Sequence, residues 1–447
     1  MKRFISQFIP GRVFSLAFPV MLGMLSQVLL NVVDTAMVGR LSAAALAATA
    51  LGSTAFLVIA LTFESLGTGT QILASRRWGE NDPLGSSRVL FNSLILTLPL
   101  GLLLSFLGAS KILPFMHLLI ADPEVLKLAT VYTRLRFFSL FFILMVSSLR
   151  GYFDGIGKTG IRMQYMILVV GLNIVLNYLL IFGKMGFPRL EVAGAALATT
   201  FSVIIGAFYI LACALLDKGL RRRPFFRRDN YCISIINKIF YFSLPKGLRM
   251  LFGFSAFLIF LKIVGLLGVA ELAASNILIT ILSCTLLMGL GIGIAAATLV
   301  SNSLGARKPQ AARYYGWASC RMGVAFMGLG GLAFILFPRF IVSVFTPDPT
   351  VIELAVVPLA ILGAVQVFHA VGIVLTGCLE GAGATHWVLK MEIITHWLIL
   401  IPLAYFLAVI AQFGIVGAWS AIGFLIVLYS LIMIIKFRGE SWLNISA

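Results

Sequence analysis

Long apolar runs separated by short polar segments fill almost the whole chain. A helix needs about 20 apolar residues to cross a bilayer, and these runs lack the strict alternation that predicts a strand. Because a backbone in hydrocarbon must satisfy its own hydrogen bonds, runs of this length predict helices. Twelve of them lie at residues 14–36, 46–74, 87–109, 125–149, 162–183, 192–216, 238–265, 272–300, 313–337, 351–376, 387–411 and 415–436. The pattern therefore predicts an all-α polytopic membrane protein with twelve transmembrane helices.

The composition supports this prediction. Of the 447 residues, 60% are hydrophobic and 11% are charged, and the mean hydropathy is +1.05. Soluble globular chains are about 45–50% apolar and about 25% charged. A chain of this composition could not hide its apolar surface from water, so we expect lipid to be its solvent.

The net charge of +18 would fit a nucleic-acid-binding protein, but its distribution along the chain argues against one. If the N-terminus is inside, cytoplasmic segments hold 22 of the 34 Lys and Arg residues and outside segments hold 7. The positive-inside rule then places both termini in the cytoplasm. The densest basic cluster, KGLRRRPFFRR at 218–228, predicts contact with anionic lipid headgroups. We expect an integral protein of the plasma (bacterial inner) membrane that contacts lipids and no nucleic acid.

The second half of the chain repeats the first when the sequence is shifted by 226 residues. Turn residues then fall on turn residues, for example Gly67 on Gly293, and GYFDGIGKT (151–159) falls on GCLEGAGAT (377–385). Each half holds six runs, an even number, so both halves start on the same side of the membrane. This predicts a parallel internal repeat with the substrate path between or within the halves.

The repeat predicts three parts. These are an N-lobe at 1–216, a basic cytoplasmic interlobe linker at 217–237 and a C-lobe at 238–447. Two lobes that rock against each other would give alternating access to a central path. A channel needs no such pair of lobes, although duplication alone does not exclude one.

A few polar residues break the repeat. In the same register, three polar residues of the first half fall on apolar residues of the second: Asp34 on Phe260, Asn173 on Ile399 and Asn177 on Leu403. A function that needs one site would leave this pattern, and drift among packing residues would leave it too.

Asp34 is the strongest candidate for a functional residue. Gln27, Asn31 and Asp34 stand at i, i+4 and i+7 and share one helix face. An ionised Asp at the centre of a membrane helix costs about 2.5–3.5 kcal/mol and usually turns toward a cavity. Asp34 lies near the outer end of its run, which lowers this cost, yet an isolated intramembrane acid predicts a function.

Asn173 and Asn177 share a face of the fifth run, and Thr199 lies in the sixth. Together with the Asp34 carboxylate, their oxygens form a set suited to a hard cation such as Na⁺. Burial would also favour the protonated form of Asp34, so that residue could carry H⁺ instead. The alternative is that these side chains are polar contacts between helices.

Other polar residues give weaker signals. We expect Gln27, Asn31, Gln366 and His369 to line a substrate cavity, with a packed histidine as the alternative for His369. Glu64 is compatible with a cavity, with a helix break or with a contact between lobes. No catalytic triad, phosphate-binding loop or metal-ligand cluster occurs, which argues against an enzyme. The cysteines have no paired spacing and predict neither disulfides nor a metal site: Cys213, Cys232, Cys284, Cys320 and Cys378.

Over almost its whole length the chain resembles the multidrug and toxic compound extrusion (MATE) family. The segments that carry the resemblance are VDTAMVGRLSAAALAA (33–48), LNIVLNYLLIFG (172–183), GAALATT (194–200) and the paired loops GYFDGIGKT and GCLEGAGAT. The resemblance implies two six-helix lobes and antiport of amphipathic organic cations against Na⁺ or H⁺, without a cofactor. It also implies a coupling carboxylate at Asp34, a polar pair at Asn173 and Asn177 and a hydroxyl at Thr199.

The chain departs from part of the family's pattern. NorM-type members have a Glu in the seventh helix, where this chain has Gly253, and an Asp in the tenth, where it has His369. Acids are therefore absent from these two C-lobe positions. This favours coupling in the N-lobe and a place in the DinF-like branch.

The resulting hypothesis is an antiporter that functions as a monomer. The coupling ion binds at Asp34 while the path is open outside, drug leaves, and the lobes rock before drug binds again from the cytoplasm. One alternative is a flippase for a lipid-linked precursor, with Arg134, Arg136 and Arg249 forming a cationic cavity. Another is a non-transporting membrane scaffold, which would have no need for Asp34.

Overall fold

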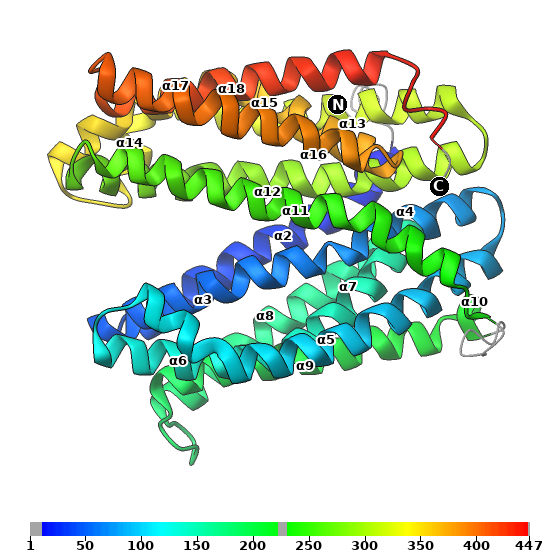
Figure 1. Ribbon diagram of the computed structural model, residues 1–447, viewed down its shortest axis with the longest axis horizontal. Coiled ribbons are helices and arrows are strands. Elements are labelled where there is room, and N and C mark those ends of the chain that lie inside the picture. Colours follow the sequence, from blue (N-terminus) through cyan, green and yellow to red (C-terminus); the bar gives the residue numbers. More distant parts are fainter. Residues whose placement is uncertain (1–10, 222–229, 446–447) are drawn as a thin grey trace. The chain divides into compact units, whose positions relative to one another are not determined.

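The computed structural model describes residues 11–221 and 230–445, and these residues form helices and short connections without a strand (Figure 1). Residues 222–229, which hold most of the predicted basic interlobe linker's arginines, lie outside the described part. The helices of the first half are α2 (Gly11–Val38), α3 (Ala43–Glu64), α4 (Leu66–Gly79), α5 (Pro83–Leu119), α6 (Pro123–Phe137), α7 (Leu140–Gly155), α8 (Thr159–Phe182), α9 (Glu191–Leu216) and α10 (Lys218–Arg221).

The second half contains helices of similar length and one long segment with π-helical turns. The elements are α11 (Ile233–Gly265), α12 (Val269–Gly305), α13 (Pro309–Leu336), α14 (Pro338–Ser343), α15 (Pro349–Gly381), α16 (Thr385–Ile393), η2 (Ile394–Leu400), α17 (Ile401–Tyr405), η3 (Phe406–Ile410) and α18 (Gly414–Arg438). From α16 to η3 the chain runs as one span, Thr385–Ile410.

Twelve spans account for all the described helices except the short α10 and α14. Eleven are single segments long and apolar enough to cross a membrane, and the twelfth is the pair Pro123–Phe137 and Leu140–Gly155, which meet at 44°. The predicted all-α membrane fold is therefore confirmed. The fourth span differs from its prediction as one continuous helix, because it breaks after Phe137.

Asp-Pro pairs start helices at equivalent places in the two halves. The Asp122 carboxylate accepts a hydrogen bond from the Val125 amide at 2.9 Å, and Pro123 occupies the first turn of α6. Asp348 does the same for α15, where it accepts from the Thr350 amide at 2.9 Å. An N-cap carboxylate followed by Pro satisfies a free helix amide and presets the backbone angle. The repeated turn signals therefore mark helix starts.

Glycines at repeated positions let helix backbones touch. A Cβ added to Gly151 on α7 would lie 2.2 Å from the carbonyl oxygen of Gly67 on α4. The equivalent pair in the second half makes the same contact, since a Cβ on Gly377 of α15 would lie 2.4 Å from the Gly293 oxygen of α12. Small residues at such crossings are how membrane helices approach closely. The repeat register therefore preserves a helix crossing.

The chain divides into two compact units, and the boundaries between them fall within two helices. One unit consists of residues 22–247, and the other of residues 1–21 together with 248–447. The boundaries fall inside α2 and α11, two residues after Pro19 and Pro245 respectively. The units thus differ from the expected lobes, because the first turns of α2 group with the C-terminal helices and the first turns of α11 with the N-terminal ones.

Each unit has its own apolar core. In the N-terminal unit, Phe56 and Phe137 pack edge to face with ring centroids 5.6 Å apart. In the C-terminal unit, Phe260 and Trp419 pack edge to face at 5.6 Å, and the Trp419 indole donates to Ser275 Oγ at 2.9 Å. That bond satisfies the indole N–H, which a buried tryptophan needs.

The glycine crossings predict a strong dependence on side-chain size. Replacing Gly377 with Ala should lower the free energy of unfolding by about 1–3 kcal/mol, because the new methyl group overpacks against a backbone oxygen. The same change at Gly171 on α8, where a Cβ meets no atom within 4 Å, should be neutral or stabilising by roughly 0.4–1 kcal/mol. Denaturant titration in detergent measures both values. Equal effects at the two positions would contradict the crossing.

Candidate functional site

Asp34 lies in the last turn-and-a-half of α2 and contacts the fifth span. The Asn177 side-chain amide on α8 donates to Asp34 Oδ1 at 2.5 Å and to Asn173 Oδ1 at 2.9 Å. Asp34 is half-buried, whereas Asn173 and Asn177 are fully buried. The two asparagines, one helical turn apart, therefore present a continuous polar face to the carboxylate.

Thr199 on α9 extends this chain of hydrogen bonds. The Asn173 amide donates to Thr199 Oγ1 at 3.1 Å, and the Thr199 hydroxyl donates to the Ala195 carbonyl at 3.0 Å. Close packing of α9 on α8 makes the contact possible, because a Cβ on Gly194 would lie 2.5 Å from the Leu180 oxygen. The structure thus brings together all four residues of the predicted ion site.

One oxygen within this network is unpaired. Asn177 uses its amino group twice, and its Oδ1 is buried with no hydrogen-bond donor among the described residues. A buried carbonyl oxygen without a partner costs free energy that a bound cation would recover. Together with the half-buried Asp34 carboxylate, this oxygen fits a hard monovalent cation, which prefers oxygen ligands.

Gln27 and Asn31 lie on the same helix as Asp34 and are exposed. Neither side chain forms a hydrogen bond with the described part of the chain. Exposed amides on a membrane helix fit a water-filled path, so their predicted place on a substrate cavity stays a prediction.

Gln366 and His369 lie in α15 of the C-terminal unit. Gln366 is fully buried, and its amide donates to Thr285 Oγ1 of α12 at 3.0 Å. His369 is half-buried, and its Nδ1 has no hydrogen-bond partner among the described residues. The burial of Gln366 favours a packing role. His369 is compatible both with a cavity-lining residue and with a packed histidine.

Arg136, which the sequence offered only for the flippase alternative, lies beside the candidate ion site. The Arg136 guanidinium near the end of α6 stacks on the Phe56 ring, 4.6 Å from its centroid, and lies within electrostatic range of Asp34. Tyr132, one turn earlier on the same face of α6, is buried and lies in range of both charges. The signal in the sequence was an arginine inside a predicted span, but the sequence did not show which way its side chain points.

Two ion pairs in the N-terminal unit explain further intramembrane charges. Glu64, whose role the sequence left open, pairs with Arg150 of α7. Asp154 pairs with Arg162 of α8 at 2.7 Å, with both side chains buried. Paired buried charges of this kind hold helices together and are not free for a ligand.

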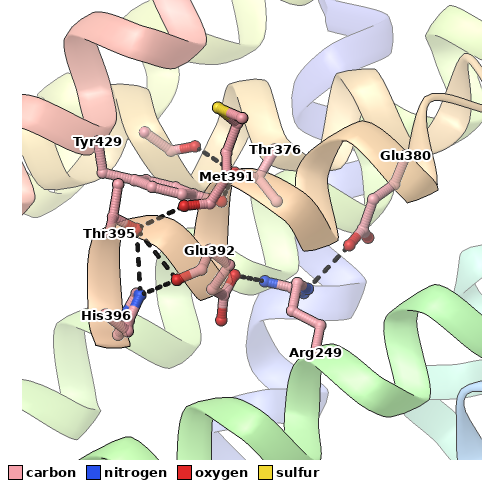
Figure 2. Close-up of polar contacts among 9 residues, drawn as sticks. Arg249, Thr376, Glu380, Met391, Glu392, Thr395, His396 and Tyr429 are labelled. Carbon is pink, nitrogen blue, oxygen red and sulfur yellow. Dashed lines mark hydrogen bonds and ion pairs between the residues drawn. The ribbon is translucent and has the colours of Figure 1, made fainter. Parts of the chain in front are cut away.

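The C-terminal unit holds an ionic cluster that sequence analysis did not predict (Figure 2). Arg249 of α11 binds Glu380 of α15 at 3.1 Å and Glu392 of α16 at 2.9 Å. All three side chains are at most 13% exposed. This unit therefore buries two acids, although Gly253 and His369 stand where NorM-type members have a Glu and an Asp. The signal was present, because Asp154 and Glu380 are equivalent in the two repeated loops.

This cluster changes the interpretation of the three arginines considered for a cationic cavity. Arg249 is compensated by two carboxylates, and Arg134 is exposed. Only Arg136 of the three faces the interior without a carboxylate partner among the described residues. Two of the three arginines are therefore compensated or exposed, which weakens the flippase alternative.

Two repeated six-span units with charges held inside the membrane define an integral membrane transporter. The family model MatE matches residues 19–179 and 245–406, two segments that begin 226 residues apart. The chain belongs to the MATE family, whose members are transporters rather than enzymes.

Relatives and solved structures match over nearly the full length. A probable multidrug resistance protein NorM of Burkholderia mallei is 30% identical over 435 residues, 95% of this chain and 92% of that protein. The multidrug resistance protein NorM of Burkholderia vietnamiensis is 30% identical over 410 residues, 90% and 88% of the two chains. A structure described as the outward-facing conformation of a multidrug resistance MATE family transporter of the MOP superfamily has a TM-score of 0.88 at 24% identity, covering 96% and 94%. The DinF-like branch stays a prediction.

The Arg249 cluster predicts a large loss of stability when its cation is removed. Arg249→Met leaves two buried carboxylates without a counter-ion and should lower the free energy of unfolding by about 3–5 kcal/mol. Arg339→Met breaks an ion pair with Glu353 whose side chains are 69% and 62% exposed, and should cost about 1 kcal/mol at most. Adding Glu380→Gln and Glu392→Gln to Arg249→Met should restore most of the loss. Equal effects of the two single changes in a denaturant titration would refute the assignment.

Proposed function

We propose that this protein is a cation-coupled antiporter that exports amphipathic organic cations by alternating access, with Na⁺ or H⁺ bound at Asp34. The observation that carries the proposal is the hydrogen-bonded series Asp34, Asn177, Asn173 and Thr199, drawn from three spans of one unit. The names of the similar proteins, which describe multidrug resistance, support the substrate class.

Asp34 supplies the negative charge, and Asn173 and Asn177 supply the hydrogen bonds that position it. Asn177 and Asn173 are fully buried and hold one another in place, so they fix the Asp34 carboxylate against α8. Na⁺ would bind between Asp34 and the unpaired Asn177 Oδ1, whereas H⁺ would neutralise the carboxylate directly. Either ion neutralises the Asp34 carboxylate and so removes its negative charge from the substrate path.

Coupling follows from competition for that charge. An organic cation is attracted to the ionised carboxylate, and an ion bound at Asp34 weakens this attraction. The coupling free energy is reciprocal, so bound drug must weaken the ion to the same degree. Exchange then proceeds when the ion arrives from outside and drug arrives from the cytoplasm. In this arrangement both termini lie in the cytoplasm, the protein lies in the plasma membrane, and one chain suffices.

The flippase alternative has less support. It needs a cationic pocket for a pyrophosphate group, and two of its three arginines are compensated or exposed. Of these three, Arg136 alone faces the interior without a carboxylate partner within the described part of the chain, and it lies beside an acid that would repel a polyanion. The observations therefore favour a substrate that carries positive charge.

Transport by purified protein in proteoliposomes tests the proposal. Ethidium efflux should follow an imposed Na⁺ gradient or an imposed pH gradient, and Asp34→Asn should abolish it because Asn cannot bind H⁺ or balance Na⁺. Asp348→Asn is the matched control, since Asn is an equally good N-cap for α15, and it should keep wild-type transport. Transport that survives in Asp34→Asn, or that follows neither gradient, would contradict the proposal.

A further inference from the structure

A groove on the C-terminal unit lies between α13 and α15 and contains an arginine. Its volume is about 490 Å³, and it is lined by Trp317, Cys320, Arg321 and Val324 of α13 and by Val371 of α15. Sites for small molecules have volumes of about 300–1,000 Å³ and are mostly apolar with a few polar groups. Among these five residues Arg321 alone is charged, so the groove fits an amphipathic molecule with an anionic group.

Arg321 belongs to the face of α13 that points away from the protein. Tyr314, Ala325 and Leu332 are seven residues before, four after and eleven after Arg321, so they share its helix face. All three are exposed, while Gly323 on the opposite face packs against Val374 of α15. Exposed apolar side chains on a membrane helix contact lipid. A charge inside a span usually faces the protein interior, so an arginine on this face needs a partner from the lipid.

The depth of Arg321 suits a headgroup. It lies eight residues inside the predicted span 313–337, about 12 Å along the helix axis. Long side chains on a helix point back toward its N-terminus, which here is the direction of Trp317, one turn away. In the proposed orientation this is also the direction of the cytoplasmic headgroups. Arginines inside a span reach headgroups in this way, and the bilayer thins locally to meet them.

The Trp317 end of the groove is held by α18. The rings of Trp317 and Phe437 pack edge to face with centroids 5.5 Å apart, and a Cβ on Gly316 would clash with the Phe437 ring. Trp442 stacks on Phe437 with centroids 4.6 Å apart. These contacts fix the Trp317 ring without a ligand, so binding requires little ordering of this part of the protein.

The helical scaffold does not require a charge at this position. Under the shift of 226 residues Arg321 falls on Ile95 of α5, and Val371 falls on Met145 of α7. Both counterparts are apolar, and Met145 is buried where Val371 is half-buried. The arginine in the groove therefore distinguishes the C-terminal unit from the first half of the repeat.

The ends of α13 and α18 nearest the groove are basic. They carry Lys308, Arg313, Lys436 and Arg438, and the acid Glu440 pairs with Arg313 at 3.0 Å. Basic side chains at the cytoplasmic end of membrane helices attract anionic headgroups. The charge around the groove therefore favours a lipid with a net negative charge.

We propose that this groove binds one anionic phospholipid, whose phosphate accepts hydrogen bonds from the Arg321 guanidinium and whose acyl chain lies against Val324 and Val371. In the proposed orientation the lipid belongs to the cytoplasmic leaflet. A guanidinium presents donors that match a phosphate, and basic pockets between membrane helices on the cytoplasmic side bind anionic headgroups. Phosphatidylcholine offers the same phosphate, but the basic helix ends repel its ammonium group.

Native mass spectrometry of purified, delipidated protein tests the proposal, because it resolves individual bound lipids. The wild type should bind its first phosphatidylglycerol about tenfold more tightly than its first phosphatidylcholine of the same chain length. Arg321→Gln should weaken the first phosphatidylglycerol by about tenfold to hundredfold, the usual effect of losing a charge-assisted hydrogen bond. Arg321→Lys should restore part of the affinity. Arg339→Gln, which removes a cation from an exposed ion pair outside the groove, is the control and should match the wild type.

A second variant separates the groove from the charge. Val371→Phe adds volume to the groove and keeps Arg321, and it should also weaken the first phosphatidylglycerol. Thermal unfolding without lipid checks that both variants are folded. Because Val371→Phe leaves the charge unchanged, its effect cannot come from a general loss of positive surface charge.

Several outcomes would overturn the proposal. Arg321→Gln that binds phosphatidylglycerol like the wild type would do so, and equal losses in Arg321→Gln and Arg339→Gln would indicate general surface charge. Displacement of the lipid by inorganic phosphate would assign Arg321 to a free anion. Wild-type affinity in Val371→Phe, or equal wild-type affinities for the two lipids, would contradict binding in the groove. Binding is measured without drug or an ion gradient, so the result is independent of the proposed antiport.

Discussion

A charge that leaves water must find a partner, and this constraint organises the interior of the protein. The Asp34 carboxylate accepts a hydrogen bond from Asn177, Arg150 pairs with Glu64, and Arg249 is held by two glutamates. Each pairing ties together helices that lie apart in the sequence. Removing one partner of a buried pair leaves an uncompensated charge, which costs far more than an exposed pair contributes. The pairs therefore constrain which helices meet.

Some buried polar atoms have no hydrogen-bond partner among the described residues. Asn177 Oδ1 and two nitrogen atoms of Arg136 are buried without partners among the described residues, and both lie near Asp34. In the C-terminal unit, Arg249 is paired with the carboxylates of Glu380 and Glu392. The proposal that the coupling ion binds in the N-terminal unit rests on the Asp34 carboxylate and its hydrogen-bonded asparagines.

Much of the fold is predictable from the sequence, because its signals are local. Apolar length marks the spans, Asp122-Pro123 and Asp348-Pro349 mark helix starts, and the repeated glycines mark helix crossings. The bend in the fourth span was not predicted, because the apolar run continues through Phe138 and the break depends on Ser139 bonding back to a carbonyl. The division of α2 and α11 between units is likewise set by packing between distant segments.

The candidate ion site was predictable for a similar reason. Asp34, Asn173 and Asn177 are polar residues within long apolar runs, and helical spacing alone brings the two asparagines together. The surroundings of Arg136 and the role of Glu392 were not predicted, because an arginine or glutamate near a span end can point to several neighbouring helices. Only the packed structure shows that one stacks on Phe56 and the other pairs with Arg249.

The central claim is that ion and substrate exclude each other at Asp34, and an equilibrium measurement tests it most directly. Fluorescence polarisation of ethidium gives its Kd for purified protein at several Na⁺ concentrations and pH values. The account predicts that one of the two ions weakens ethidium binding to the wild type and has no effect on Asp34→Asn. An ethidium Kd that depends on neither ion, or that depends on the ion equally in both proteins, would contradict it.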